Sequence, residues 1–201
     1  MFVNLAENYA RPPVKEDNYR KLVFNGDKNS FFQDLISAYK GSTTHSSICK
    51  TYINMIWGRG LNIKGEEVDS KKNLELKEII SDKDTRAIVT DYQILGSFAG
   101  QVHRQKGEEG KGSNKIAKIE HLDVTKLAPS LRDEKGNITS YTYCYDWEKE
   151  YEYPPVEYPA IGYGDGTKPE VFVCQPYIIG GGYFADPVFI SALPYAQLEE
   201  E

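Results

Sequence analysis

The sequence predicts an α+β fold in which helices come first and antiparallel strands follow. Between residues 30 and 96, apolar residues recur about every fourth position, as they do along one face of a helix. After Gly96 they alternate with polar residues, which is the pattern of a strand with one buried face. Because the helices precede the strands and do not alternate with them, the pattern favours an α+β domain over a parallel sheet.

The first two helices have the clearest local signals. Ser30 begins one helix, because Gln33 follows it at the spacing of a capping box, and Gly41 ends it. A second helix follows at once: a hydroxyl residue among 42–44 caps its start, and Gly58 ends it. We expect the apolar faces of the two helices to pack together. The candidate core residues on these faces are Phe31, Leu35, Ile36, Ile48, Tyr52, Ile53 and Ile56.

The remaining elements follow from the same patterns. Two more helices are expected over residues 70–81 and 84–95, each begun by a Ser or an Asp. Turn residues then separate short alternating segments, which is typical of antiparallel hairpins. The expected strands are 98–102 and 115–122 around a glycine-rich tip at 107–114, 138–145 after a turn at 133–137, and 170–177, with a long loop at 148–169.

The expected elements divide the chain into three parts. Residues 1–29 are polar and contain Pro12-Pro13, so we expect an extended N-terminal arm. Residues 30–193 hold the helices and strands of the α+β domain. Residues 194–201 begin with a proline and carry acids, which favours a helix start. We expect this last segment to be the beginning of a helix that continues in a longer chain.

Composition excludes several classes of protein. The net charge of −6 argues against a protein that coats nucleic acid or membranes through a general positive field. No run of 18 apolar residues occurs, so no transmembrane helix is expected. Cys49, Cys144 and Cys174 are scattered and odd in number, which indicates reduced thiols and neither a disulfide framework nor a zinc site.

Catalytic and metal-ligating patterns are weak. His121 and Asp123 could offer two ligands, but no second pair stands at metal spacing. His45 lies in a Ser/Thr-rich helix start, where we expect a polar capping role. No nucleophile elbow occurs, and the glycine-rich runs lack the Lys-Ser/Thr of a phosphate loop. We therefore predict no catalytic residue, no metal, no cofactor and a protein that is not an enzyme.

Tyrosine is the most unusual feature, with 15 in the chain. Seven of them lie between residues 141 and 163, with Trp147 among them, and three alternate on the strand expected at 138–145. Such rings suit a protein interface, since they bury much area at little entropic cost. They also suit a platform that stacks on sugars, or a core that tyrosines cover. The candidate interface residues are Tyr9, Tyr19, Tyr151, Tyr153 and Tyr158.

Four ordered segments resemble a known family. They are Phe31-Phe32-Gln33-Asp34-Leu35 leading to Tyr39-Lys40-Gly41-Ser42-Thr43-Thr44-His45, Ile56-Trp57-Gly58-Arg59-Gly60-Leu61, Tyr141-Thr142-Tyr143-Cys144-Tyr145-Asp146-Trp147, and Tyr183-Phe184-Ala185-Asp186-Pro187 through Leu193-Pro194-Tyr195. Together they resemble the portal proteins of tailed bacteriophages, the rings at the capsid vertex through which DNA passes. The first segment departs from the family pattern, because Thr43 stands where many portals have proline.

The resemblance implies the N-terminal, wing-like part of a portal subunit, with residues 194–201 as the start of the stem helix. It implies a structural protein of the virion, present in the host cytoplasm during assembly, in a ring that is dodecameric in the family. Its partners would be other portal subunits and the major capsid protein, with terminase and the tail adaptor held by regions beyond residue 201. DNA would pass through the channel without specific binding, no membrane is involved, and the family has no catalytic residues. The alternative is a tyrosine-rich module that binds carbohydrate or protein.

Overall fold

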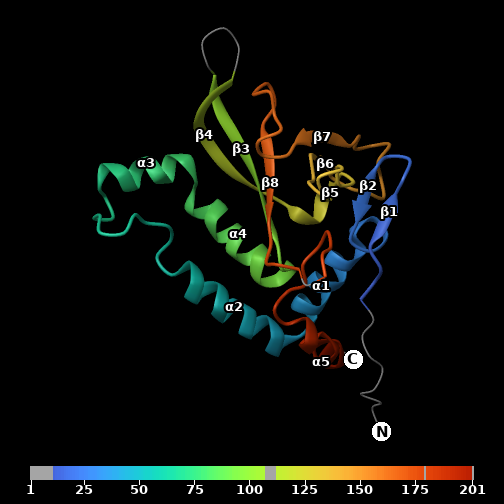
Figure 1. The fold of residues 1–201 in the computed structure, drawn as a ribbon. Helices are drawn as coiled ribbons and strands as arrows, with labels where there is room; N and C mark the ends of the chain where they lie inside the picture. The colour runs from blue at the N-terminus through green and yellow to red at the C-terminus, as the bar shows by residue number, and fades with distance from the viewer. Residues whose placement is uncertain (1–10, 107–111, 179, 201) are drawn as a thin grey trace.

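The structure is a computed structural model that describes residues 11–106, 112–178 and 180–200 (Figure 1). Within these residues the chain forms α-helices and three small antiparallel sheets, so the predicted α+β class is confirmed. The helices are α1 (Ser30–Gly41), α2 (Thr43–Trp57), α3 (Lys71–Ile79), α4 (Asp82–Leu95) and α5 (Leu193–Glu200), with short 3-10 turns at Asp27–Asn29, Val124–Lys126 and Ile190–Ala192.

Side-chain caps define where three of these helices begin. The hydroxyl oxygens of Ser42, Ser70 and Ser81 accept hydrogen bonds from backbone N–H groups three residues further on, at the starts of α2, α3 and α4. The start of α1 differs from the prediction. Its N-cap is Asn29, and Ser30 is the first helical residue, whose hydroxyl accepts from the backbone N–H of Asp27.

Gly96 ends α4, at the point where the hydrophobic period of the sequence changes. Its φ of 75° lies in the left-handed region, and its backbone N–H donates to the carbonyl of Tyr92. A Cβ at this position would stand 2.6 Å from the backbone nitrogen of Pro187. Glycine is therefore required here by both conformation and space.

The sheets are small and antiparallel. The largest has the order β4-β3-β8, from Gly112–Leu122, Phe98–Lys106 and Glu170–Cys174, and α4 runs beside it (Figure 1). A second sheet has the order β5-β6-β7, from Leu127–Pro129, Ser140–Tyr143 and Val156–Pro159. The third is the hairpin of β1 (Lys15–Asp17) with β2 (Leu22–Phe24). Because β7 pairs with β6, the expectation that residues 148–169 form only a loop is wrong; the tip expected at 107–114 lies mostly outside the described residues.

The main core surrounds α1. Phe31, Phe32 and Leu35 are at most 1% exposed. They belong to one buried cluster with residues of α2, α4 and of all three sheets, and with Leu193 and Ala196 of α5. The Phe32 ring stands edge-on to that of Phe184, with centroids 6.0 Å apart. Leu193 and Ala196 of α5 therefore pack with the α+β domain, and the expectation that residues 194–201 begin a longer helix stays a prediction.

The expected N-terminal arm is also corrected. Residues 1–10 lie outside the described residues, but β2 is fully part of the fold, with Val23 completely buried in the main core. A smaller second cluster joins the other side of β2 to the second sheet. Residues 22–29 are therefore a structural element of the domain. The second cluster consists of Leu22, Phe24, Ala128, Cys144 and Trp147.

The prediction for the core face of α2 is partly wrong. Phe31, Leu35 and Ile53 are buried and Ile36 packs partly buried against the core, as expected. The other three candidates are not in the core: Ile48, Tyr52 and Ile56 are 51, 52 and 57% exposed. The reason is the rotation of α2 about its axis, which turns His45, Cys49 and Ile53 inward instead.

This rotation predicts different costs for two neighbouring isoleucines. Ile53→Ala is expected to lower the free energy of unfolding by about 2–4 kcal/mol, since it empties space in the core. Ile56→Ala removes a side chain that is 57% exposed, and we expect a change within about 0.5 kcal/mol. Urea denaturation of both variants measures the difference. Equal losses would mean that α2 packs with a different face inward.

Candidate functional site

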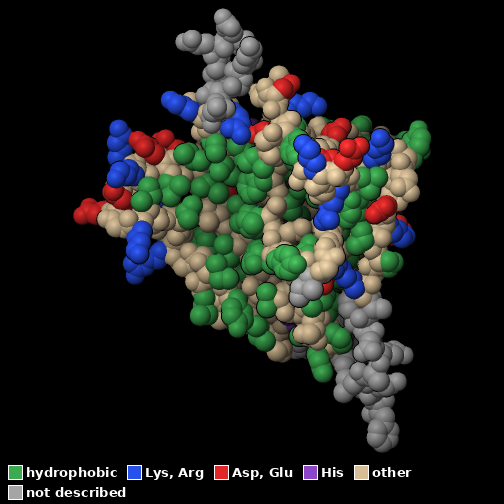
Figure 2. Space-filling model, in the orientation of Figure 1, with side chains coloured by type: hydrophobic (Ala, Val, Ile, Leu, Met, Phe, Trp, Pro, Cys, Tyr) green, Lys and Arg blue, Asp and Glu red, His purple; other side chains and the backbone are tan. Residues whose placement is uncertain are grey.

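The first candidate surface is an apolar stripe on α2. Ile48, Tyr52, Met55 and Ile56 stand at positions i, i+4, i+7 and i+8, so they share one side of the helix. Each is at least half exposed, and Met55 reaches 72%. Figure 2 shows apolar side chains gathered at the lower left, where α2 lies in Figure 1. We call these four residues the α2 stripe; clustered exposed apolar groups of this kind mark interaction sites.

The second candidate surface is the connection between β6 and β7, residues 144–155, which we call the tyrosine loop. Tyr145, Tyr151 and Tyr153 are 57, 103 and 40% exposed. The rings of Tyr145 and Tyr153 lie against each other, with centroids 4.9 Å apart. The ammonium of Lys126 stands 4.0 Å from the Tyr145 ring centroid, a cation–π contact. The loop therefore presents aromatic surface in a defined arrangement.

Buried contacts hold the tyrosine loop in place from within. The Cys144 thiol donates to the carbonyl oxygens of Asp146 and Tyr153, both at 3.2 Å. Burial raises the pKa of this thiol, which keeps its proton available for these bonds. The Trp147 ring stands edge-on to Phe24 of β2, with centroids 4.9 Å apart. Cys144 thus acts as a structural hydrogen-bond donor that closes the loop.

Ion pairs hold the same loop against the β1–β2 hairpin. Arg20 lies 2.6 Å from Glu150, and Lys28 lies 3.2 Å from Glu148. Between the loop and the 3-10 turn Asp27–Asn29 is an open hollow of about 450 Å³, lined by Lys28, Trp147, Glu148, Glu150, Tyr151, Pro154 and Pro155. A loop fixed in this way loses less conformational entropy when a partner binds it.

The tyrosines expected at an interface differ in location and exposure. Tyr151 and Tyr153 lie in the tyrosine loop, and Tyr19 is 96% exposed at the turn between β1 and β2, next to Arg20. Tyr158 is corrected: it lies on β7, partly buried against the main core, and is not free surface. Tyr9 lies outside the described residues.

The α2 stripe and the tyrosine loop lie on different sides of the molecule. In Figure 1, α2 is at the lower left, and the β1–β2 hairpin that holds the loop is at the right. Their charges are opposite. Residues 35–65 contain four basic side chains and no acid, namely Lys40, Lys50, Arg59 and Lys64, whereas residues 144–157 contain Lys149 against five acids, namely Asp146, Glu148, Glu150, Glu152 and Glu157. This difference in charge is readable in the sequence alone.

His45 does not have the capping role expected of it. Ser42 is the cap of α2, and the side chain of His45 is buried. Its ring packs on that of Phe189 with centroids 4.1 Å apart, and the Cys49 sulfur lies 3.8 Å from its ring nitrogens. His45 is therefore part of the contact between α2 and the segment that leads into α5.

His121 is paired with a carboxylate across the fold. Its Nε2 lies 2.6 Å from Oδ2 of Asp91 on α4, and its backbone N–H donates to Asp84 at 3.1 Å. The Asp91 hydrogen bond raises the pKa of His121, with smaller contributions from the charges of Asp123 and Asp84. Burial raises the pKa of Asp91, and the bond from His121 opposes this. The pair fastens α4 to β4 (Gly112–Leu122), and the described part of the chain holds no group of three ligating side chains suited to a metal ion.

The His121–Asp91 pair predicts a pH-dependent stability. A histidine whose pKa is higher in the folded than in the unfolded state stabilises the fold when it is protonated. This contribution is fully present below the unfolded pKa of about 6.5 and is lost as the pH rises through the folded pKa. We therefore expect His121→Gln to cost about 1.5–3 kcal/mol at pH 6 and less at pH 9.

Urea denaturation at the two pH values measures this difference. The matched control is His103→Gln, because His103 pairs with Glu120 at a more exposed site, where the side chains are 34 and 39% exposed. The control should change stability little at either pH. A cost for His121→Gln that is the same at both pH values would contradict the assignment.

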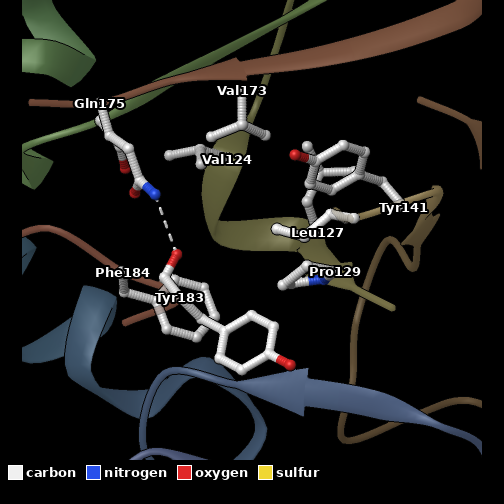
Figure 3. Close-up of a pocket in the computed structure, with 10 residues that line it drawn as sticks. Val124, Leu127, Pro129, Tyr141, Val173, Gln175, Tyr183 and Phe184 are labelled. Atoms are coloured by element: carbon white, nitrogen blue, oxygen red, sulfur yellow. Dashed lines mark hydrogen bonds between the residues drawn. The ribbon is translucent and has the colours of Figure 1, made fainter. Parts of the chain in front are cut away.

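One enclosed apolar cavity lies between the two larger sheets (Figure 3). It is lined by Tyr141 of β6, Val173 of β8, Leu127 of β5 and Val124 of the 3-10 turn before β5. At its edge, the Gln175 side chain donates to the Tyr183 carbonyl at 3.1 Å. Burial raises the pKa of Tyr141 to about 12. The cavity volume of about 20 Å³ is room for a water molecule and not for a sugar or a substrate.

Comparisons with known proteins add no family. No protein-family model matches the chain, and no curated protein matches its sequence. Within the described residues, no helix combines the length and the apolar character needed to cross a bilayer. What the structure defines is a mixed α+β domain with two exposed surfaces of different character, the α2 stripe and the tyrosine loop.

Proposed function

We propose that this protein is a structural subunit that assembles with copies of itself into a ring, as portal proteins of tailed bacteriophages do. The observation that carries the proposal is the α2 stripe, four apolar side chains at least half exposed on one helix. A domain that stays alone leaves such a stripe in contact with water, whereas a subunit that assembles covers it with its neighbour. A cyclic ring further needs two different faces on each subunit, and the tyrosine loop is a second, separate one.

The four portal-like segments support the same proposal. The first spans α1 and the capped start of α2, and the second covers the last turn of α2 and the residues after it. The third runs from β6 into the tyrosine loop, and the fourth leads into α5. The capsid vertex, the major capsid protein and the packaging machinery are the proposed setting on this resemblance. The net charge of −6 suits a protein past which DNA slides.

A binding module for carbohydrate is the second candidate. The hollow of about 450 Å³ beside Tyr151 favours it, because an exposed ring next to an open depression can stack on a sugar. A glycan array, followed by titration of any hit against Tyr151→Ala, tests this candidate. An array without ligands removes it.

Light scattering and negative-stain electron microscopy test the proposed function. We expect the chain of 201 residues to be mainly monomeric at micromolar concentration, and a chain extended along its reading frame to form closed rings. In the resembled family, most of the ring contact comes from the stem and crown, which explains the difference. An extended chain that stays monomeric at high concentration, or turnover of a substrate by the shorter chain, would overturn the proposal.

A further inference from the structure

We infer that the α2 stripe of one copy docks on the tyrosine loop of the next copy, in a head-to-tail contact. The inference rests on the proposed function, because it names the two faces that a self-assembling subunit would join. It commits to one occupant for the α2 stripe, namely a second copy of this chain.

Charge decides between the possible pairings of the two faces. A contact of α2 with α2 would bring together two helices in which Lys50 is the single side chain among Lys, Arg, Asp and Glu. A contact of loop with loop would bring together two segments with a net charge of −3, from four acids and one base, although two of those acids are paired within the chain. Like charges that face each other oppose association, and opposite charges favour it. Only the pairing of α2 with the tyrosine loop joins opposite signs.

Part of the charge on each face is available to a partner. Glu148 and Glu150 are neutralised by Lys28 and Arg20 of the same chain. Asp146, Glu152 and Glu157 form no ion pair with the described residues. On the other face, Lys50 lies over the Tyr39 ring at 6.0 Å, and a cation–π contact leaves its positive charge in place. Arg86 of α4 also lies against α2, where it donates to Asn54 at 3.4 Å and stands over the Trp57 ring at 5.1 Å.

The shapes and chemistry of the two faces also complement each other. The α2 stripe projects from a helix, and the tyrosine loop borders an open hollow of about 450 Å³ between Trp147, Tyr151 and two prolines. Apolar side chains such as Met55 and Ile56 could fill such a hollow, and exposed tyrosines are favoured partners for them. The loop is already fixed by the Cys144 bonds and the ion pairs, so docking requires little ordering.

Two variants, each with one face disabled, test the inference. The double variant Met55→Asp, Ile56→Asp disables the α2 stripe, because the new acids repel the acids of the loop. Both changed positions are exposed, and so are the other two residues of the stripe. Tyr151→Ala combined with Glu152→Lys disables the tyrosine loop. Sedimentation velocity of the wild type is expected to show weak association, with a dissociation constant of about 0.1–1 mM. Each variant alone should associate at least about tenfold more weakly.

The decisive measurement is the equimolar mixture of the two variants. Each retains the face that the other lacks, so the mixture is expected to form a one-to-one dimer that does not grow further. This dimer should weaken as salt is added, because its charges are then screened. Leu74→Asp on α3 and Tyr177→Ala are the matched controls, since both residues are exposed outside the two faces. Thermal unfolding checks that all variants fold.

The possible outcomes separate the inference from the proposed function. If the wild type associates but the mixture stays monomeric, the pairing is wrong and self-assembly stands. If only the α2 variant loses association, the contact is α2 with α2, which also overturns the inference. A wild type without any association at about 1 mM overturns it as well. The proposed function itself fails if the extended chain forms no ring or if the chain turns over a substrate.

Discussion

Replacing Phe31 by alanine is expected to lower the free energy of unfolding by about 3–5 kcal/mol. The side chain is completely buried in α1, at the centre of the main core, and the Arg11 guanidinium lies 5.1 Å from its ring centroid. Removing the ring leaves a cavity inside the main core, which the surrounding structure can fill only in part by relaxing. Since domains are stable by about 5–15 kcal/mol, this single change removes a large share of the total.

Chemical denaturation of Phe31→Ala beside Phe31→Leu measures the effect. The leucine variant keeps most of the apolar volume and should cost less than half as much as the alanine variant. A loss below about 1 kcal/mol for Phe31→Ala would show that α1 does not form the centre of the core.

Replacing Asn29 is expected to have the second largest effect. Its side-chain amide donates to the carbonyl oxygens of Thr125 and Leu127, both at 2.9 Å, and its carbonyl oxygen accepts from the backbone N–H of Asn25 at 3.0 Å. All three bonds are buried. Asn29 also has a φ of 68°, in the left-handed region that asparagine tolerates better than most residues.

Two substitutions separate these contributions. Asn29→Gly keeps the backbone conformation but leaves three buried backbone groups without partners, and we expect a loss of about 2–4 kcal/mol. Asn29→Ala adds the strain of a side chain at positive φ, about 1 kcal/mol more. Urea denaturation of both variants measures the two values. A glycine variant as stable as the wild type would show that the three bonds contribute nothing net.

The same contacts explain why residues 22–29 do not form the arm that their polarity predicts. Residues 1–29 look like an arm because they are polar and contain two prolines. In the structure, Asn25 and Asn29 are completely or almost completely buried, and their polarity serves hydrogen bonds inside the fold. A sequence shows that asparagine is polar but not that its partners, such as Leu127, come from about 100 residues away. The polarity of a segment therefore does not decide whether it is an arm.

The candidate surfaces were predictable to different degrees. Tyr151 and Tyr153 could be identified as candidate surface residues, because tyrosine-rich loops have a compositional signature, and both are exposed in the structure. The α2 stripe could not, since Ile48, Tyr52 and Ile56 look like core residues in any helical projection. Tyr158 was misassigned for the opposite reason: it lies on β7 against the core, and the pairing of β7 with β6 involves no local signal.

The sequence by itself determined the elements whose signals are local. Ser42 and Ser70 cap helices at the predicted starts, Gly96 ends α4, and the period of the apolar residues separates helices from strands. Each of these signals acts within about four residues, through a hydrogen bond or a backbone angle. The segregation of charge between residues 35–65 and 144–157 is likewise a property of the sequence alone.

Only the tertiary structure decided which surfaces are buried. The apolar residues of α2 cover more of the helix than the single face that α1, α4 and α5 cover. Their packing turns Ile53 inward and leaves Ile56 in water, a choice that depends on where helices distant in the sequence lie. Burial is set by the sum of long-range contacts, and a helix with two apolar sides carries no local preference between them. The exposed side of α2 is therefore a consequence of the whole fold.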